Sequence, residues 1–342
     1  MAQEFPGARG YFNTASIGLP PAMAADKLRA AIDEWQHGRA TAPGYDACIE
    51  ESRALFAEMV NVPAEWVAIG SQVSALVGMV AAGLQPGARI VCPEEEFTSV
   101  IFPFLAREDL DVTLVPLEKL GDSITPDFDL VAFSLVQSAD GRVANGRAIA
   151  QVARDCGALT MVDATQAAGW LPFDAGDYDI TVTGTYKWLM SPRGTAFMTV
   201  RPESLDRPAL LYPGWYAGDS PWDAIYGPPL RLAQDARRFD LSPGWLAWVG
   251  TAASLGFIQA IGVAGIHEHN SALANTFRAQ IGIPESDSAI VSLELPSTTN
   301  QERLRKLSTA ERAGRLRVGF HLYNQQEDVD LLLEALGVFP GN

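Results

Sequence analysis

Short apolar runs recur along the chain, separated by stretches of helical periodicity. Six of these runs are nearly continuous in apolar residues and rich in β-branched ones, at residues 88–93, 111–117, 128–136, 157–164, 178–184 and 195–200. Continuous rather than alternating apolar runs are typical of strands buried on both faces of a mostly parallel sheet, with helices packed on either side. The pattern therefore predicts an α/β fold.

The stretches between these runs predict the helices. Helical periodicity begins near Ala22 and returns over residues 47–60, 145–156 and 245–262. Residues 65–84 indicate a strand, a glycine turn and a helix. The apolar residues that share one face of this helix by their three- and four-residue spacing are Val73, Leu76, Val77, Val80 and Leu84. Residues 207–244 are rich in Pro and Gly and predict long loops.

This order of elements predicts three parts. Residues 1–21 form an N-terminal arm, because Pro and Gly within residues 11–21 forbid a long helix. Residues 22–262 form a large cofactor-binding domain. Residues 263–342 contain a helix, strands and a final helix, and form a small C-terminal α+β domain. A chain of 342 residues is long enough for one large and one smaller core.

Charge and composition narrow the expected partners and location. The formal net charge of -16 argues against nucleic acid and against a polybasic membrane contact. No apolar stretch reaches the ~18 residues of a membrane span, and the first residues lack the pattern of a signal peptide. Cys48, Cys92 and Cys156 are widely spaced and odd in number, which suits reduced thiols in a cytoplasmic protein.

Candidate chemistry is densest between residues 161 and 200. Asp163 ends a predicted strand, the usual place for functional side chains in open α/β sheets. Lys187 follows the next predicted strand and stands between Tyr186 and Trp188. Burial there would lower the pKa of the amine and make it a nucleophile. The residues alone leave an alternative open, in which Lys187 is a surface lysine and Asp163 caps a turn or a helix.

The segments DATQAAGW (163–170) and TYKWLMSPRG (185–194) resemble the class V aminotransferase family over nearly the whole chain. These are the fold-type I pyridoxal-phosphate (PLP) enzymes that include cysteine desulfurases, kynureninase and isopenicillin N epimerase-like proteins. The resemblance implies a seven-stranded sheet, PLP as cofactor and an amino acid as substrate. It implies Lys187 as the Schiff-base lysine and Asp163 as the partner of the ring nitrogen. Tyr186 departs from the desulfurases, which carry His there, and is kynureninase-like.

The same resemblance implies further cofactor contacts. The turn GSQVS (70–74) opens a helix whose unpaired N–H groups and dipole favour an anion, so Ser71, Gln72 and Val73 are expected to hold the phosphate. For these three residues an ordinary helix cap is the alternative reading. The remaining expected contacts are Phe97 stacked on the ring, Gln166 near the phenolic oxygen, and Thr185 at the phosphate.

The segment RFDLSP (238–243) resembles the part of family members that reaches the phosphate of the neighbouring subunit. It implies a homodimer, with Ser242 as the contact. RLRVGFHLYNQQEDVDLLLEAL (315–336) resembles the closing segment of the family, in which Arg317 matches the arginine that binds the substrate carboxylate. Strand alternation places Arg315 on the same face, so the choice between the two arginines stays open. Asn13, in the N-terminal arm, is expected to border the substrate pocket.

Other chemistries lack their signatures. His267 and His269 are two residues apart, which suits a surface helix better than a metal pair, so no metal is expected. No G-x-G-x-x-G follows a strand and no G-x-S-x-G is present, which leaves nicotinamide dehydrogenases and serine hydrolases without support.

The reaction expected from the resemblance is a lyase-type transformation of an amino acid, such as a β-elimination at a C–S bond. Specialised metabolism is the expected setting of this reaction. An aminotransferase or an epimerase is the enzymatic alternative. A cofactor-free scaffold protein is the non-enzymatic one, and it would need neither Lys187 nor Asp163. No cysteine follows Cys156, although the desulfurases that use a thiol carry it in the C-terminal part of the chain. A persulfide on an enzyme thiol is therefore not expected.

Overall fold

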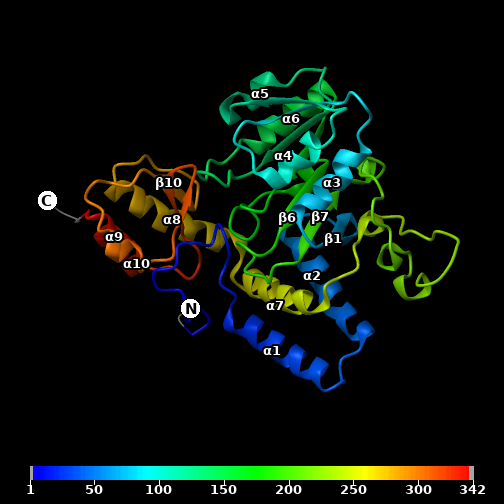
Figure 1. The fold of residues 1–342 in the computed structure, drawn as a ribbon, viewed down its shortest axis with the longest axis horizontal. Coiled ribbons are helices and arrows are strands. Elements are labelled where there is room, and N and C mark those ends of the chain that lie inside the picture. The colour runs from blue at the N-terminus through cyan, green and yellow to red at the C-terminus, as the bar shows by residue number, and fades with distance from the viewer. Residues whose placement is uncertain (1–2, 339–342) are drawn as a thin grey trace.

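The computed structural model describes residues 3–338. Its centre is a seven-stranded sheet with the order β1-β7-β6-β5-β4-β2-β3 (Figure 1). The strands are β1 (Val67–Gly70), β2 (Arg89–Pro93), β3 (Asp111–Val115), β4 (Leu130–Ser134), β5 (Leu159–Asp163), β6 (Ile180–Gly184) and β7 (Ala196–Val200). Neighbouring strands from β3 to β6 pair in parallel, whereas β7 runs antiparallel to both β6 and β1. The predicted α/β fold with a mostly parallel, seven-stranded sheet is confirmed.

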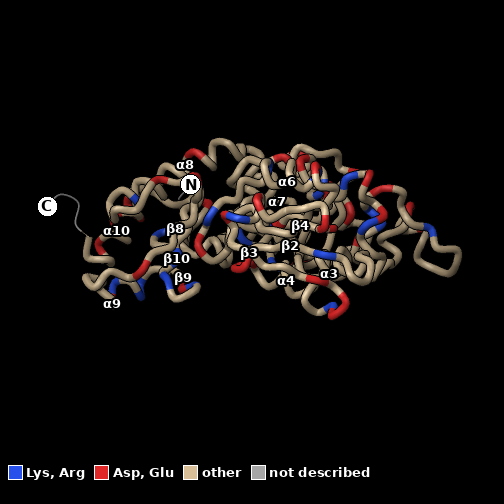
Figure 2. The backbone as a smooth tube through the Cα atoms, turned by 90° about the horizontal axis from the view of Figure 1, so that it is seen from above, with Lys and Arg blue, Asp and Glu red and all other residues tan. Residues whose placement is uncertain are grey.

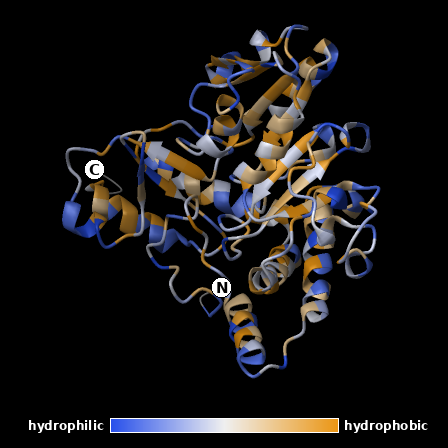
Figure 3. Cartoon of the chain, turned by 45° about the vertical axis from the view of Figure 1, so that its right-hand side comes forward, coloured by the Kyte–Doolittle hydropathy of each residue, from blue (hydrophilic) through white to orange (hydrophobic). Residues whose placement is uncertain are grey.

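Helices cover both faces of this sheet. They are α1 (Ala22–Gln36), α2 (Asp46–Met59), α3 (Val73–Gly83), α4 (Thr98–Leu105), α5 (Leu120–Ser123), α6 (Gly146–Cys156) and α7 (Trp245–Ile261). Helices α3 and α4 pack together and share one apolar cluster with alternate strand residues, and α2, α6 and α7 share the cluster on the opposite face. The strands are coloured as hydrophobic and lie between these two layers (Figure 3).

The apolar runs are buried as their composition predicts, with one exception. Every residue of β4, β6 and β7 is buried. Strand β3, which the same pattern predicts to be buried on both faces, is half-exposed. Its place at the edge of the sheet explains the difference, because only one neighbouring strand, β2, covers it.

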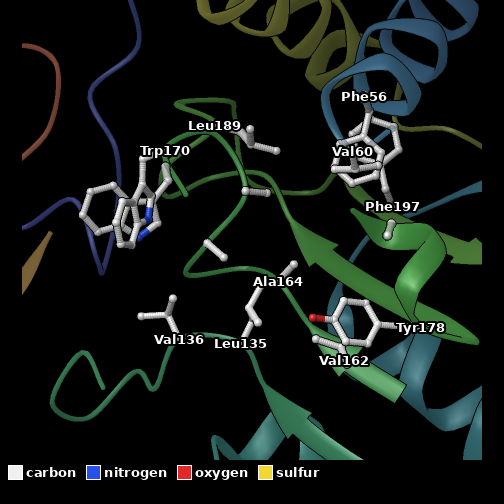
Figure 4. Packing of buried hydrophobic residues seen from close by; sticks show 14 of the residues in the cluster. Phe56, Val60, Leu135, Val136, Val162, Ala164, Trp170, Tyr178, Leu189 and Phe197 are labelled. Carbon is white, nitrogen blue, oxygen red and sulfur yellow. The ribbon is translucent and has the colours of Figure 1, made fainter. Parts of the chain in front are cut away.

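Aromatic contacts anchor the core between α2, α7 and the sheet. The ring of Phe56 on α2 stacks on that of Phe197 on β7, with 4.2 Å between centroids (Figure 4). Trp248 of α7 meets Phe197 edge-on at 5.3 Å. Such aromatic pairs contribute about 0.5–1.5 kcal/mol each beyond the area they bury. They hold the helices of this face to the sheet near the end that carries the site, because Phe197 pairs with Ile69 of β1 and Thr183 of β6.

The C-terminal part forms a second, smaller sheet with its own helices, beside the large sheet (Figure 1). Its antiparallel sheet has the order β8-β10-β9, and its elements are α8 (Val263–Gln280), β8 (Ile290–Leu293), α9 (Gln301–Leu304), β9 (Ala310–Arg312), β10 (Arg315–Gly319) and α10 (Gln326–Leu336). The small α+β arrangement matches the expectation. The boundaries 1–21, 22–262 and 263–342 themselves stay predictions.

The N-terminal arm ties the two sheets together. The backbone of Phe12 exchanges hydrogen bonds with Ser308 and Gly319 of the small part, at 2.8 Å each. A few residues later, Gly18 donates a backbone hydrogen bond to Tyr186 of the large part, at 2.9 Å. A Cβ at Gly18 would lie 1.9 Å from the carbonyl oxygen of Lys187, so only glycine permits this approach. The arm therefore reaches the candidate lysine.

Within residues 3–338 no single helix is long and apolar enough to cross a membrane; α7 and α8 meet the length and composition criteria only as a pair bent by 79°.

Candidate active site

A cavity of about 260 Å³ opens where the parallel strands end. Asp163 and Ser134 are the last residues of β5 and β4, and the loops after β1, β2 and β6 supply most of the other walls. Carboxyl ends of neighbouring parallel strands meet at one edge of a sheet, which is where ligands bind in open α/β folds. The lining residues are Ser71, Gln72, Val73, Ser74, Phe97, Ser99, Ser134, Ser138, Asp163, Thr165, Gln166, Gly184, Tyr186, Lys187, Arg193, Gly194 and Thr195.

Seven of the residues expected from the sequence line this cavity together. They are Ser71, Gln72, Val73, Phe97, Asp163, Gln166 and Lys187. Four others, Asn13, Thr185, Ser242 and Arg317, are not among its lining residues. The specific role of each residue stays a prediction, although the structure shows which of them share one pocket.

Asp163 is a buried carboxylate at the end of β5. It is 4% exposed, and its Oδ1 accepts a hydrogen bond from the backbone amide of Thr165 at 2.7 Å. Burial raises the pKa of Asp163 to about 6, although the hydrogen bonds from Thr165 and the charge of Lys187 oppose the shift. Because this pKa is below neutrality, the carboxylate is mostly ionised at pH 7.

Lys187 lines the same pocket as Asp163 and is 5% exposed. Its Nζ lies 5.1 Å from the ring centroid of Phe97 and 5.7 Å from that of Tyr186. Burial lowers the pKa of Lys187 to about 8, an effect that Asp163 opposes and the arginines around the pocket reinforce. The alternative of a solvent-exposed lysine is wrong, because the side chain is buried.

Helix α3 points its amino end into the same cavity. Gln72 is the N-cap residue, and its side chain makes no capping hydrogen bond. The first amide groups of a helix have no partner within the helix, and the helix dipole adds partial positive charge there. Because residues 71–74 line the cavity, this end of the pocket has the chemistry of an anion site.

Gln166 is held by a network that uses its whole amide. Its Nε2 donates to the carbonyl of Ala15 and to the hydroxyl of Ser138, at 3.0 Å each. Its Oε1 accepts a hydrogen bond from the indole of Trp188 at 2.7 Å. A contact from Gln166 to a bound molecule therefore requires one of these partners to be exchanged.

Arg317 and Arg315 take different positions although they share β10. Arg317 is 2% exposed; its guanidinium donates to the carbonyl of Ser138, to the hydroxyl of Ser138 at 3.2 Å and to that of Ser16 at 2.8 Å. Arg315 has a side chain that is 41% exposed and pairs with Glu294 at 3.2 Å. Because Ser138 lines the cavity, Arg317 is the arginine that lies next to it.

The other three expected residues lie away from the cavity wall. The hydroxyl of Thr185 donates to the carbonyl of Thr195 at 3.0 Å, and Thr195 takes the place on the wall. Ser242 is exposed, directly after a segment that pairs with β1. Asn13 is half-buried in the arm, and within the described chain its Oδ1 accepts no hydrogen bond.

Sequence reasoning missed several members of the site. Four of them, Ser134, Ser138, Thr165 and Arg193, line the cavity, and the fifth, Glu96, lies behind the wall and accepts a hydrogen bond from Ser134. The available signals were that Glu96 directly precedes Phe97 and that Arg193 lies in the SPRG segment after the lysine. Polar residues at loop starts are common, so these signals do not separate a site residue from a turn residue.

The residues present fit PLP. The uncapped start of α3 with its serines suits a phosphate, and the half-exposed ring of Phe97 offers a wall for an aromatic ring. The buried carboxylate of Asp163 suits a protonated ring nitrogen, and the Lys187 amine suits an aldehyde. In the part of the chain that the structure describes, no group of three or more His, Cys, Asp or Glu residues has metal-site geometry. The fold and the pocket together define the class as a PLP-dependent enzyme.

Comparison with known proteins supports the same class of enzyme. Residues 44–302 match the aminotransferase class-V family, so the chain belongs to this family, whose members use PLP. It is 28% identical to the uncharacterized aminotransferase YcbU of Bacillus subtilis, over 96% of this chain and 94% of that protein. It is 23% identical to a probable cysteine desulfurase of Methanothermobacter thermautotrophicus, over 86% and 84% of the two chains.

A solved structure is similar over the whole length. The cystine C-S lyase C-DES, in complex with its reaction product cysteine persulfide, has a TM-score of 0.88 with 21% identity, covering 98% of this chain and 99% of that one. At this identity the likeness shows the fold. It agrees with the two-part architecture seen here.

Proposed function

We propose that the protein is a PLP-dependent lyase that removes a substituent, such as a thiol, from Cβ of an amino acid. The observation that carries the proposal is a buried amine with a pKa of about 8 in a pocket that no cysteine lines. Two of the proteins it is similar to, a probable cysteine desulfurase and a cystine lyase, act on C–S bonds. Family membership supports the same class of chemistry.

Lys187 and Asp163 have separate tasks in this proposal. When bound, PLP supplies an electron sink for a carbanion at Cα. Lys187 would hold the cofactor, and once the amino group of the substrate has displaced it, its lowered pKa would let it take the Cα proton near neutral pH. Asp163, ionised and buried, keeps the ring nitrogen protonated. The C–S bond would break with its electron pair on sulfur, and the proton held by Lys187 would complete the thiol. The released enamine would tautomerise to an imine, which one water molecule hydrolyses to pyruvate and ammonia.

Arg317 is the proposed partner of the substrate α-carboxylate. Arg317 is buried beside the cavity, and its guanidinium N–H groups donate hydrogen bonds to neutral oxygens of Ser138 and Ser16. A carboxylate would accept the same planar donors bidentately and with a stronger, charge-assisted interaction.

The proposal includes a homodimer with the active site at the interface. The loop between β7 and α7 exposes large apolar side chains, at Leu210, Leu211, Tyr212, Trp222, Ile225, Tyr226 and Leu230. Burial of exposed apolar side chains is a common basis of self-association. Ser242 follows Asp240, which is buried in an ion pair with Arg53 at 2.7 Å, so its segment is rigidly placed. Light scattering that finds a fully active monomer would contradict the dimer.

Two measurements test the function. The purified protein should be yellow, and borohydride should fix PLP to Lys187, as mass spectrometry would show; an adduct on another lysine would refute the assignment. The protein is then incubated with amino acids and S-substituted cysteines. We expect pyruvate, ammonia and a thiol in equal amounts. A new keto acid with transfer of the amino group, or loss of optical activity alone, would instead identify an aminotransferase or an epimerase.

A further inference from the structure

Two arginines meet at one neutral hydroxyl beside the pocket. Arg312 on β9 donates to the Oγ of Ser16 at 3.2 Å, and Arg317 on β10 donates to the same atom at 2.8 Å. The two strands are neighbours in the small sheet, and Ser16 belongs to the N-terminal arm. Figure 2 shows basic positions on β9 and β10 in a chain that carries an excess of acidic ones.

Neither arginine is neutralised within residues 3–338. No carboxylate lies within ion-pair distance of Arg312 or Arg317 there, whereas Arg315, between them in sequence, pairs with Glu294. The chain has 41 acidic and 25 basic residues, so carboxylates are plentiful elsewhere in it. What sets Arg312 and Arg317 apart is that both donate to the same hydroxyl, that of Ser16, with no carboxylate between them.

The two charges affect each other and the site. Burial and the charge of Arg312 lower the pKa of Arg317 to about 10. Both arginines lower the pKa of Lys187, and Arg317 does so more strongly than Arg312. Because the like charges of buried Arg317 and exposed Arg312 disfavour each other, an anion bound between them would be stabilised. The two arginines therefore offer positive charge to an anionic ligand. Arg317 is buried on the side of Lys187, and Arg312 is exposed on the outer side of Arg317.

We propose that Arg312 and Ser16 bind a second anionic group, carried on the side chain of the substrate. This inference rests on the proposed function, in which Arg317 takes the α-carboxylate. The substrate class is then an amino acid whose leaving group bears a carboxylate or another oxyanion. A guanidinium with several donors suits such a group, and the exposed position of Arg312 suits the distal end of a substrate.

A matched pair of ligands separates this role from simple help with the α-carboxylate. S-(2-carboxyethyl)cysteine and S-propylcysteine have similar length, and only the first carries a distal carboxylate. The holoenzyme is titrated with each, binding is followed by the absorption of the cofactor and by calorimetry, and thiol release gives KM and kcat. Arg312→Gln and Ser16→Ala are compared with Arg315→Gln, a control on the same small sheet whose arginine already has an acidic partner.

We expect Arg312→Gln to raise Kd and KM for S-(2-carboxyethyl)cysteine about 10- to 100-fold, the usual loss for a charge-assisted hydrogen bond. S-propylcysteine should change by less than about twofold, Ser16→Ala should act in the same direction with a smaller effect, and Arg315→Gln should leave both ligands unchanged. If Arg312→Gln loses affinity equally for both ligands, or for neither, this inference is wrong while the proposed function still stands. Failure of both ligands to perturb the wild-type cofactor or release thiol would overturn the proposed function, and this inference with it.

Discussion

The carboxylate of Glu96 accepts a hydrogen bond from the backbone amide of Ser134 at 2.7 Å. The same carboxylate accepts from the hydroxyl of Ser134, from Gln137 at 3.1 Å and from the amide of Phe97 at 2.7 Å. Ser134 is the register partner of Asp163 in the neighbouring strand. Glu96 therefore joins the loop that carries the aromatic wall to the strand beside the buried carboxylate, and its charge also raises the pKa of Asp163.

We expect Glu96→Gln to weaken PLP binding by about tenfold, because the amide removes the charge and replaces one acceptor oxygen by a donor facing other donors. The dissociation constant can be measured by adding PLP to the apoprotein and following quenching of tryptophan fluorescence. Glu94→Gln, two residues away at an exposed position, is the control. Equal affinities for the two variants would show that Glu96 does not position the wall.

Lys187 should titrate near pH 8 in the apoprotein rather than at the ordinary value of 10.5. Burial disfavours the charged amine, so the neutral form appears as the pH rises through about 8. The rate of acetylation of Lys187 by trace acetic anhydride, followed by mass spectrometry between pH 6 and 11, measures this midpoint. A midpoint above 10 would contradict the buried environment.

Asp163→Asn should move that midpoint further down, since the charge of Asp163 now opposes the shift and the amide carries none. The variant should fold, and with PLP it should lose about 100-fold or more in kcat, the effect of removing about 3 kcal/mol of charge-assisted stabilisation. Turnover near that of the wild type would refute the role of Asp163. An upward move of the midpoint would show that the two groups do not interact as the structure indicates.

Replacement of all three cysteines by serine should leave sulfide or thiol release unchanged within about twofold. Burial raises the pKa of Cys48 to about 11 and that of Cys92 further still, which keeps both as unreactive thiols. None of the three lines the cavity. The assay uses cysteine with a reductant and compares wild type with the triple variant. Brisk release by the wild type that disappears in the variant would reveal a persulfide route and exclude the proposed one.

Gly141 should tolerate alanine less well than Gly87. Both have positive φ, +83° and +82°, so each substitution costs about 1 kcal/mol in backbone strain. A Cβ at Gly141 would in addition lie 2.6 Å from the Cβ of Ile290 on β8, whereas nothing lies within 4 Å at Gly87. We expect Gly141→Ala to lower the free energy of unfolding by about 2 kcal/mol more than Gly87→Ala, as urea denaturation would show. Equal losses would mean that the loop carrying Ser138 does not rest on β8.

The sequence by itself predicted the strands of the large sheet and most of its helices, and its resemblance to known segments predicted Asp163 and Lys187 as the central pair of the site. A buried strand or an amphipathic helix is defined by residues within a few positions of one another, so its pattern is readable locally. Asp163 was predictable because a polar residue that ends an apolar run lies at the carboxyl edge of the sheet. Lys187 followed from its distance along the chain and its resemblance to known segments.

Only the tertiary structure decided which polar groups meet. The contact of Ser16 with Arg312 joins residues 296 positions apart, and that of Arg317 with Ser138 joins residues 179 apart. The structure separates Arg317 from Arg315 by burial, although both share one face of a strand. It also directs the hydroxyl of Thr185 away from the cavity and leaves β3 at an exposed edge. Such outcomes depend on how two sheets and an arm pack together, and no local pattern of apolar and polar residues encodes that packing.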